Sequence, residues 1–146
     1  MASALADRGV VSCVVDPCCE NSDQTVGANP SAWPRAVAEP FDWRFDERHR
    51  PLVDAAAALV GLHPDQPTGA IVEVALRAGK PFAVVPCCVF ASQFPERRLR
   101  SGARVRRTED LVQWLSELAA RAGWEPRVAA LPLRGRNTVV YAHAPV

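Results

Sequence analysis

The chain has very little lysine, a single methionine and a single tyrosine, and it lacks any long apolar run. Because a membrane-spanning helix needs about 20 apolar residues in succession, the last absence predicts that no segment crosses a membrane. Lys80 is the only lysine, yet arginine keeps the net charge at +1, so no global field attracts nucleic acid. With 146 residues and 49% hydrophobic content, we expect one globular domain with a substantial core.

A recognisable disulfide framework is also missing. The five cysteines form an odd set of two adjacent pairs and one single residue: Cys13, Cys18, Cys19, Cys87 and Cys88. Adjacent cysteines rarely bridge each other without strain. The first ten residues also do not match a secretory signal, because charges interrupt their apolar run. We therefore predict an intracellular protein, cytoplasmic or nuclear, with reduced thiols.

Apolar patterning predicts alternating strands and helices in the later part of the chain. Strands are expected over residues 9–16, 59–63, 82–85, 127–133 and 138–143, and helices over 51–58, 65–78 and 108–122. Residues 18–50 form a loop-rich, irregular segment within the same domain, with a second short strand before Pro40. Thr108 is expected to cap the last helix, and Gly79 and Gly123 to end the last two helices.

This order predicts an α/β fold: a mostly parallel sheet covered by helices on both faces, with a C-terminal antiparallel hairpin at one edge. Ligands of such sheets lie beyond the carboxyl ends of the strands. The side chains that follow the predicted strands are therefore the candidates for function. They are Asp16, His63, Asp65, Cys87 and Cys88.

The segments GLHPDQ (residues 61–66) and KPFAVVPCC (residues 80–88) together resemble a family of methyltransferase-like proteins with a Rossmann-like fold, class I, which includes a transfer RNA ribose methyltransferase. The resemblance covers roughly residues 59–141. It implies S-adenosylmethionine as cofactor and methyl transfer to RNA or a small molecule as the activity.

The resemblance also implies roles for individual residues. Asp16, at the end of a second strand, would accept hydrogen bonds from the ribose hydroxyls of the cofactor. His63 and Asp65 would lie beside the methyl donor as the catalytic pair. Gly61, Cys87 and Cys88 complete the cofactor site.

A departure from the family lies in the glycine-rich turn, D/E-x-G-x-G-x-G, which normally follows the first strand and does not occur here. If Asp16 ends the second strand, the first strand is missing, and we expect weak or no cofactor binding by this chain alone. The alternative function is then a non-catalytic fragment that binds a protein partner at the edge left by that strand. If residues 11–16 are instead a divergent first strand, Asp16 has another role and the domain is more complete.

Each candidate also has a structural interpretation. Asp16 before Pro17 is equally typical of a turn, His63 of a hydrogen-bonded structural residue, and Asp65 of a helix cap. A thiol or zinc site at Cys87 and Cys88, with Cys18, Cys19 and His63 as possible partners, is a further alternative, although zinc ligands usually stand two to four residues apart.

An arginine-rich stretch precedes the last predicted helix and is the candidate RNA contact. Its alternative is a solvated loop, because no aromatic stacking platform is interleaved with the basic residues. The residues concerned are Arg97, Arg98, Arg100, Arg104, Arg106 and Arg107.

Overall fold

A computed structural model describes residues 7–19 and 36–145. The chain divides into two compact units, residues 1–41 and 42–146. In the first unit β1 (Val14–Val15) pairs in parallel with β2 (Ala36–Val37), the short strand expected before Pro40. The strand predicted over residues 9–16 is wrong in length, since only two of its residues pair. Most of the predicted loop-rich segment lies outside the described residues.

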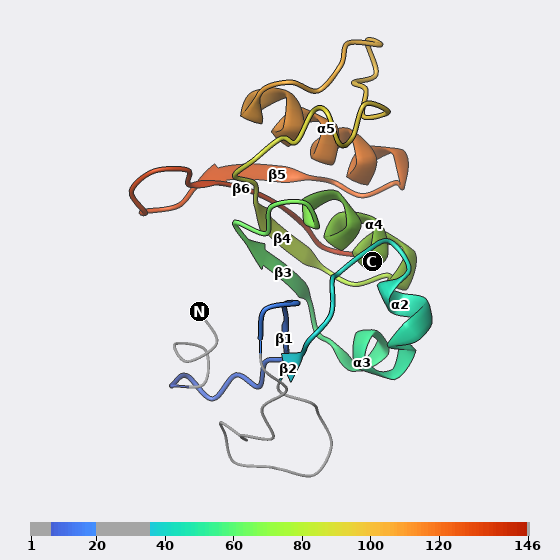
Figure 1. Cartoon of the computed structure of the whole chain (residues 1–146), viewed down its shortest axis with the longest axis vertical. Coiled ribbons are helices and arrows are strands. Elements are labelled where there is room, and N and C mark those ends of the chain that lie inside the picture. The colour runs from blue at the N-terminus through green and yellow to red at the C-terminus, as the bar shows by residue number, and fades with distance from the viewer. Residues whose placement is uncertain (1–6, 20–35, 146) are drawn as a thin grey trace. The chain divides into compact units, whose positions relative to one another are not determined.

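The second unit holds the remaining helices and strands (Figure 1). They are α2 (Phe45–Arg48), α3 (Arg50–Ala55), β3 (Leu59–Leu62), α4 (Thr68–Ala78), β4 (Phe82–Val85), α5 (Thr108–Arg121), β5 (Arg127–Ala130) and β6 (Thr138–Ala142). The protein is thus a mixed α/β structure with a four-stranded sheet, and α2 is a helix that the sequence patterning did not predict. No helix in the described part of the chain is long and apolar enough to cross a membrane.

Helix α4 follows directly from its sequence pattern. Ile71, Val74 and Ala75 are buried, and their spacings of three and four residues along the chain form one apolar stripe of the helix. The helix ends at Gly79, whose φ of 64° is the left-handed conformation that glycine adopts without a steric penalty. This end of the helix confirms the predicted C-cap and turns the chain into β4.

The sheet has the strand order β3-β4-β6-β5. β3 and β4 are parallel, whereas β6 runs antiparallel to both β4 and β5. The prediction of a mostly parallel sheet is therefore wrong, because only the β3–β4 pair is parallel, whereas the C-terminal antiparallel hairpin lies at one edge of the sheet as predicted. Burial explains the order: the apolar sequence TVVYA of β6 is largely buried, while every residue of β5, an edge strand, is exposed.

The contacts of the two long helices place both of them on one face of this sheet. The register pairs Leu59 with Phe82, so Gly61 and Phe82 face the same side. Gly61 faces Ile71 of α4, and Phe82 contacts Trp124, which lies three residues beyond the end of α5. We expected helices on both faces of the sheet, but α4 and α5 lie on the same face and contact each other there.

Candidate functional site

Chemically versatile side chains gather where β3 and β4 end. Because these two strands are parallel neighbours, the residues that follow them lie at the same edge of the sheet. We call His63, Asp65, Cys87 and Cys88, which follow the two strands, the strand-end cluster. The carboxylate of Asp65 and the thiols of the two cysteines lie within 4.8 Å of one another. The catalytic and cofactor-binding roles inferred for these residues stay predictions.

The backbone of the loop between β3 and α4 is strained at two places. His63 has a φ of 52° and Asp65 a φ of 54°, values in the left-handed region that non-glycine residues seldom occupy. Such conformations cost on the order of 1–3 kcal/mol each and gather at functional sites. The loop holds this geometry partly because Thr68, which is fully buried, donates its hydroxyl to the Asp65 carbonyl at 2.7 Å.

The side chain of Asp65 contacts a cysteine instead of capping the helix. Its Oδ1 accepts a hydrogen bond from the Cys87 thiol at 2.9 Å, and the N-cap of α4 is Pro67, which has no side-chain cap. The interpretation of Asp65 as a helix cap is therefore wrong. Burial, followed by the Asp65 side chain, raises the pKa of Cys87 to about 11, which keeps this thiol protonated at neutral pH. The neighbouring Cys88 is exposed to solvent.

The imidazole of His63 is oriented from the β5–β6 turn. Its Nε2 lies 2.8 Å from the carbonyl oxygen of Arg136, and a carbonyl can only accept a hydrogen bond. Nε2 must therefore carry the proton, which leaves Nδ1 of the neutral ring with a free lone pair. This arrangement combines the two interpretations of His63, because one ring nitrogen has a structural partner and the other is available for proton transfer.

Arg136 is a residue of this site that sequence reasoning missed. Its Nη1 donates to the carbonyl of Cys87 and to the hydroxyl of Thr108, so one side chain joins the end of β4 to the start of α5. Arg136 lies between the strands predicted over residues 127–133 and 138–143, and the sequence gives no sign that this connection reaches the ends of β3 and β4. Thr108 is correspondingly not the N-cap of α5: the N-cap is Arg107, and the side chain of Asp110 accepts its backbone N–H at 2.9 Å.

Two other predicted cofactor residues lie in different surroundings. Gly61 is buried, and a Cβ placed on it would lie 2.8 Å from Cδ1 of Ile71 and 3.0 Å from Cγ of Pro64. The position is thus filled by the packing of β3 against α4. Asp16 belongs to the first unit, where its Oδ1 accepts the backbone N–H of Cys18 at 2.7 Å in a turn. Its role at a ribose stays a prediction.

The arginine-rich stretch contains one buried member. Arg97 is only 6% exposed, and its guanidinium lies 3.6 Å from the ring centroid of Phe94 and 4.9 Å from that of Trp114. Including Arg97 among the phosphate contacts is therefore wrong, because its charge is stacked inside the fold. The remaining members are exposed around a short hairpin that closes through the Arg98–Arg104 bridge. They are Arg98, Arg100, Arg104, Arg106 and Arg107.

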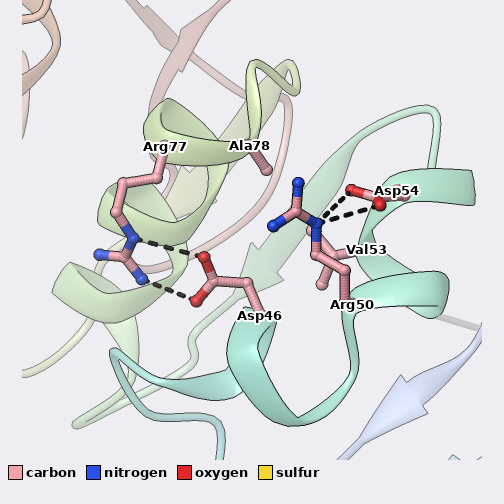
Figure 2. A pocket seen from close by; sticks show the side chains of 6 residues that line it. All are labelled: Asp46, Arg50, Val53, Asp54, Arg77 and Ala78. Atoms are coloured by element: carbon pink, nitrogen blue, oxygen red, sulfur yellow. Dashed lines mark hydrogen bonds and ion pairs between the residues drawn. The ribbon is translucent and has the colours of Figure 1, made fainter.

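A shallow pocket lies at the other end of α4, between that helix and the short helices α2 and α3 (Figure 2). Its charged side chains neutralise one another: Arg77 pairs with Asp46 at 2.8 Å, and Arg50 with Asp54 at 3.1 Å. A pocket whose charges are already paired offers little to bind a charged ligand. We therefore place the candidate site at the strand-end cluster.

Comparison with known proteins adds no relative. No family model, curated protein or solved structure matches the chain.

Proposed function

We propose that this chain is a methyltransferase-like domain with a Rossmann-like fold, in which the strand-end cluster acts on the acceptor of a methyl group from S-adenosylmethionine. The acceptor would be RNA or a small molecule. One observation carries the proposal: His63 and the Asp65–Cys87 pair follow adjacent parallel strands, at the sheet edge where α/β folds bind ligands. The strained backbone at His63 and Asp65 supports a functional role for this edge.

The chain's own residues suggest how the acceptor would be treated. Nδ1 of His63 has a free lone pair and can take the proton that leaves an acceptor hydroxyl or amine, while its Nε2–H stays on the Arg136 carbonyl. The carboxylate of Asp65 can orient the same acceptor, since Cys87 occupies only one of its oxygens in the described contacts. Methyl transfer depends mostly on alignment of donor and acceptor, so the rigid anchoring of His63 is useful.

The donor itself is poorly provided for among the described residues. A nucleoside cofactor needs a glycine cradle, but the space beside Gly61 is taken by Ile71 and Pro64. The expected ribose carboxylate, Asp16, holds a turn in the first unit. These residues do not fit S-adenosylmethionine closely, so the proposal includes weak donor binding by this chain alone.

Calorimetry and a transfer assay test the two parts of the proposal separately. We expect the full chain to bind S-adenosylmethionine more weakly than micromolar, and a micromolar dissociation constant, about −8 kcal/mol, would contradict that expectation. At saturating donor, we expect labelled methyl groups to enter RNA or a small-molecule acceptor. His63→Ala should lower that rate about 10²–10⁴-fold, as loss of a general base does, whereas His143→Ala is the matched control. A failure to methylate any acceptor at saturating donor contradicts methyl transfer.

RNA is the acceptor class that the exposed arginines favour. Arg98, Arg100 and Arg104 are carried by one hairpin next to α5, and their charges are available to phosphates. We expect RNA binding to weaken with salt, and Arg104→Gln to reduce the salt slope by about 0.7. Arg121→Gln, an exposed change at the end of α5, is the control and should leave the slope unchanged. Salt-independent binding would favour a small-molecule acceptor.

A second candidate is a partner-binding remnant of the same fold. Among the described strands β3 forms an edge of the larger sheet, and its Val60 and Leu62 are 54% and 41% exposed. Such an edge could receive a strand from a protein partner. This candidate predicts a marginally stable chain that self-associates, with Val60→Lys reducing the association in analytical ultracentrifugation. A heat-stable monomer would contradict it.

A further inference from the structure

We propose that Asp65, Cys87 and Cys88 form a binding site for a thiophilic divalent cation, with Zn²⁺ as its natural type. The inference is independent of methyl transfer and uses geometry alone. In the part of the chain that the structure describes, this is the one group of three potential ligands whose ligating atoms lie close together, within 4.8 Å of one another. Zinc accepts one carboxylate oxygen and two sulfurs as ligands, and because it binds cysteine as the thiolate, its binding would release the thiol protons to solvent.

The distances suit one cation after a small adjustment. Zinc bonds to sulfur at about 2.3 Å and to oxygen at about 2.1 Å, so ligand atoms of a tetrahedral site stand about 3.5–3.8 Å apart. The Cys87 sulfur and Oδ1 of Asp65 are already 2.9 Å apart, and no pair in the group exceeds 4.8 Å. Changes of up to about 1 Å in these separations would therefore give the spacing of a tetrahedral zinc site.

The backbone around the group is fixed from several elements. Cys87 is buried and its carbonyl accepts a hydrogen bond from Arg136, while Asp65 is held by the bonds between its carbonyl and Thr68. Cys88 is exposed and gives the cation a route from solvent. With three protein ligands, the fourth position would stay open, as in catalytic rather than structural zinc sites.

Ligand spacing along the sequence argued against zinc, because neither cysteine pair shows the usual gap of two to four residues. The tertiary structure removes this objection. The third ligand comes from the loop after β3, which is distant in the sequence but adjacent across the parallel pair. The two neighbouring cysteines can therefore act together with Asp65 without a sequence motif.

Metal titration of the reduced, full-length chain tests the proposal. Zn²⁺ affinity is measured by competition with a chromophoric chelator, and Co²⁺ is used to detect thiolate-to-metal charge-transfer absorption. We expect a single Zn²⁺ site and a charge-transfer band. Cys88→Ser should weaken Zn²⁺ binding at least about tenfold, since changes to groups that merely support metal ligands already cost about 10–100-fold. Because Cys88 is exposed, this variant should keep the fold, which circular dichroism can verify.

Two controls make the result decisive. Cys18→Ser changes an exposed cysteine outside the group, and Asp54→Asn changes an exposed carboxylate in α3. Both should bind Zn²⁺ as the unmodified chain does, whereas Asp65→Asn should lower the affinity. The proposal is overturned if the unmodified chain does not bind Zn²⁺, if Co²⁺ gives no charge-transfer band, or if Cys18→Ser costs as much affinity as Cys88→Ser.

Discussion

Replacement of Gly61 by alanine tests whether this glycine serves packing or a ligand. The added Cβ would lie 2.8 Å from Cδ1 of Ile71 and 3.0 Å from Cγ of Pro64. Carbon atoms prefer a separation of about 3.5–4.0 Å, so the side chain of Ile71 and the ring of Pro64 must each move away from the added Cβ, by up to roughly 0.7 Å. Ile71 is itself buried on α4, which limits its freedom to yield.

The magnitude follows from two opposing effects. Overpacking of a core costs about 1–3 kcal/mol, and the loss of backbone freedom in the unfolded chain returns about 0.4–1 kcal/mol. We therefore expect Gly61→Ala to lower the free energy of unfolding by about 1–2 kcal/mol in urea titrations followed by circular dichroism. Val60→Ala alters an exposed neighbour on the opposite face and should change that free energy by less than about 0.5 kcal/mol.

A double-mutant cycle identifies the clash itself. Ile71→Val deletes Cδ1, the atom nearest to the added Cβ, and alone should cost about 0.5–1.5 kcal/mol. In the Gly61→Ala background the same deletion should cost about 0.5–1 kcal/mol less, because it also relieves the clash. Additive effects, or a Gly61→Ala chain as stable as the original, would refute the packing role. A change in S-adenosylmethionine binding without a change in stability would assign Gly61 to the ligand.

Three further predictions concern charged and thiol groups. The pKa of the Cys87 thiol is raised to about 11, so in chelator-treated protein this thiol should react with iodoacetamide roughly 200-fold more slowly at pH 8 than an ordinary thiol. Peptide mass spectrometry measures the two rates. Equal rates would contradict the effects of burial and of Asp65 on this pKa. The hydrogen bond from Arg77 lowers the pKa of Asp46 in the folded protein. The stability contributed by the Arg77–Asp46 pair is therefore fully present above the ordinary carboxyl pKa of about 4 and is lost as the pH falls through the lowered pKa of Asp46. Asp46→Asn should accordingly reduce stability at pH 7 and flatten the acid limb of urea-midpoint profiles; an unchanged limb would argue against the ion pair. Arg97→Met should retain most of the stability, because it keeps a buried apolar stem and loses only the guanidinium, whereas Arg97→Ala should cost about 2–4 kcal/mol in the same titration. Equal losses would show that the guanidinium over the rings of Phe94 and Trp114 matters more than the packing of the stem.

Local sequence signals predicted the elements of the second unit well. The apolar run at residues 82–85 is β4 with the same bounds, and the stripe ending at Gly79 is the buried face of α4. These signals act within a few residues: burial follows apolar spacing, and glycine permits the left-handed C-cap. For the same reason the chemistry-bearing residues after the strands could be named, since a strand end is marked locally by Pro64 and Pro86.

The partners of those residues were decided only by the tertiary structure. The apolar content of β6 is typical of a central strand, but its sequence does not indicate that its neighbours in the sheet are β4 and β5. That position brings the preceding turn, and with it Arg136, to the strand ends. Burial of Arg97 likewise depends on Trp114, which is distant along the chain and adjacent only after α5 has packed.

The sequence by itself determined most of the strands and helices of the second unit and which reactive side chains follow the strands, because these properties depend on neighbouring residues. The tertiary structure alone decided that Asp65 meets Cys87, that Nε2 of His63 is committed to a carbonyl, and that Gly61 is filled by packing. Each of these contacts joins residues on different elements, and their distances are set by strand register and helix packing, which local patterns do not encode.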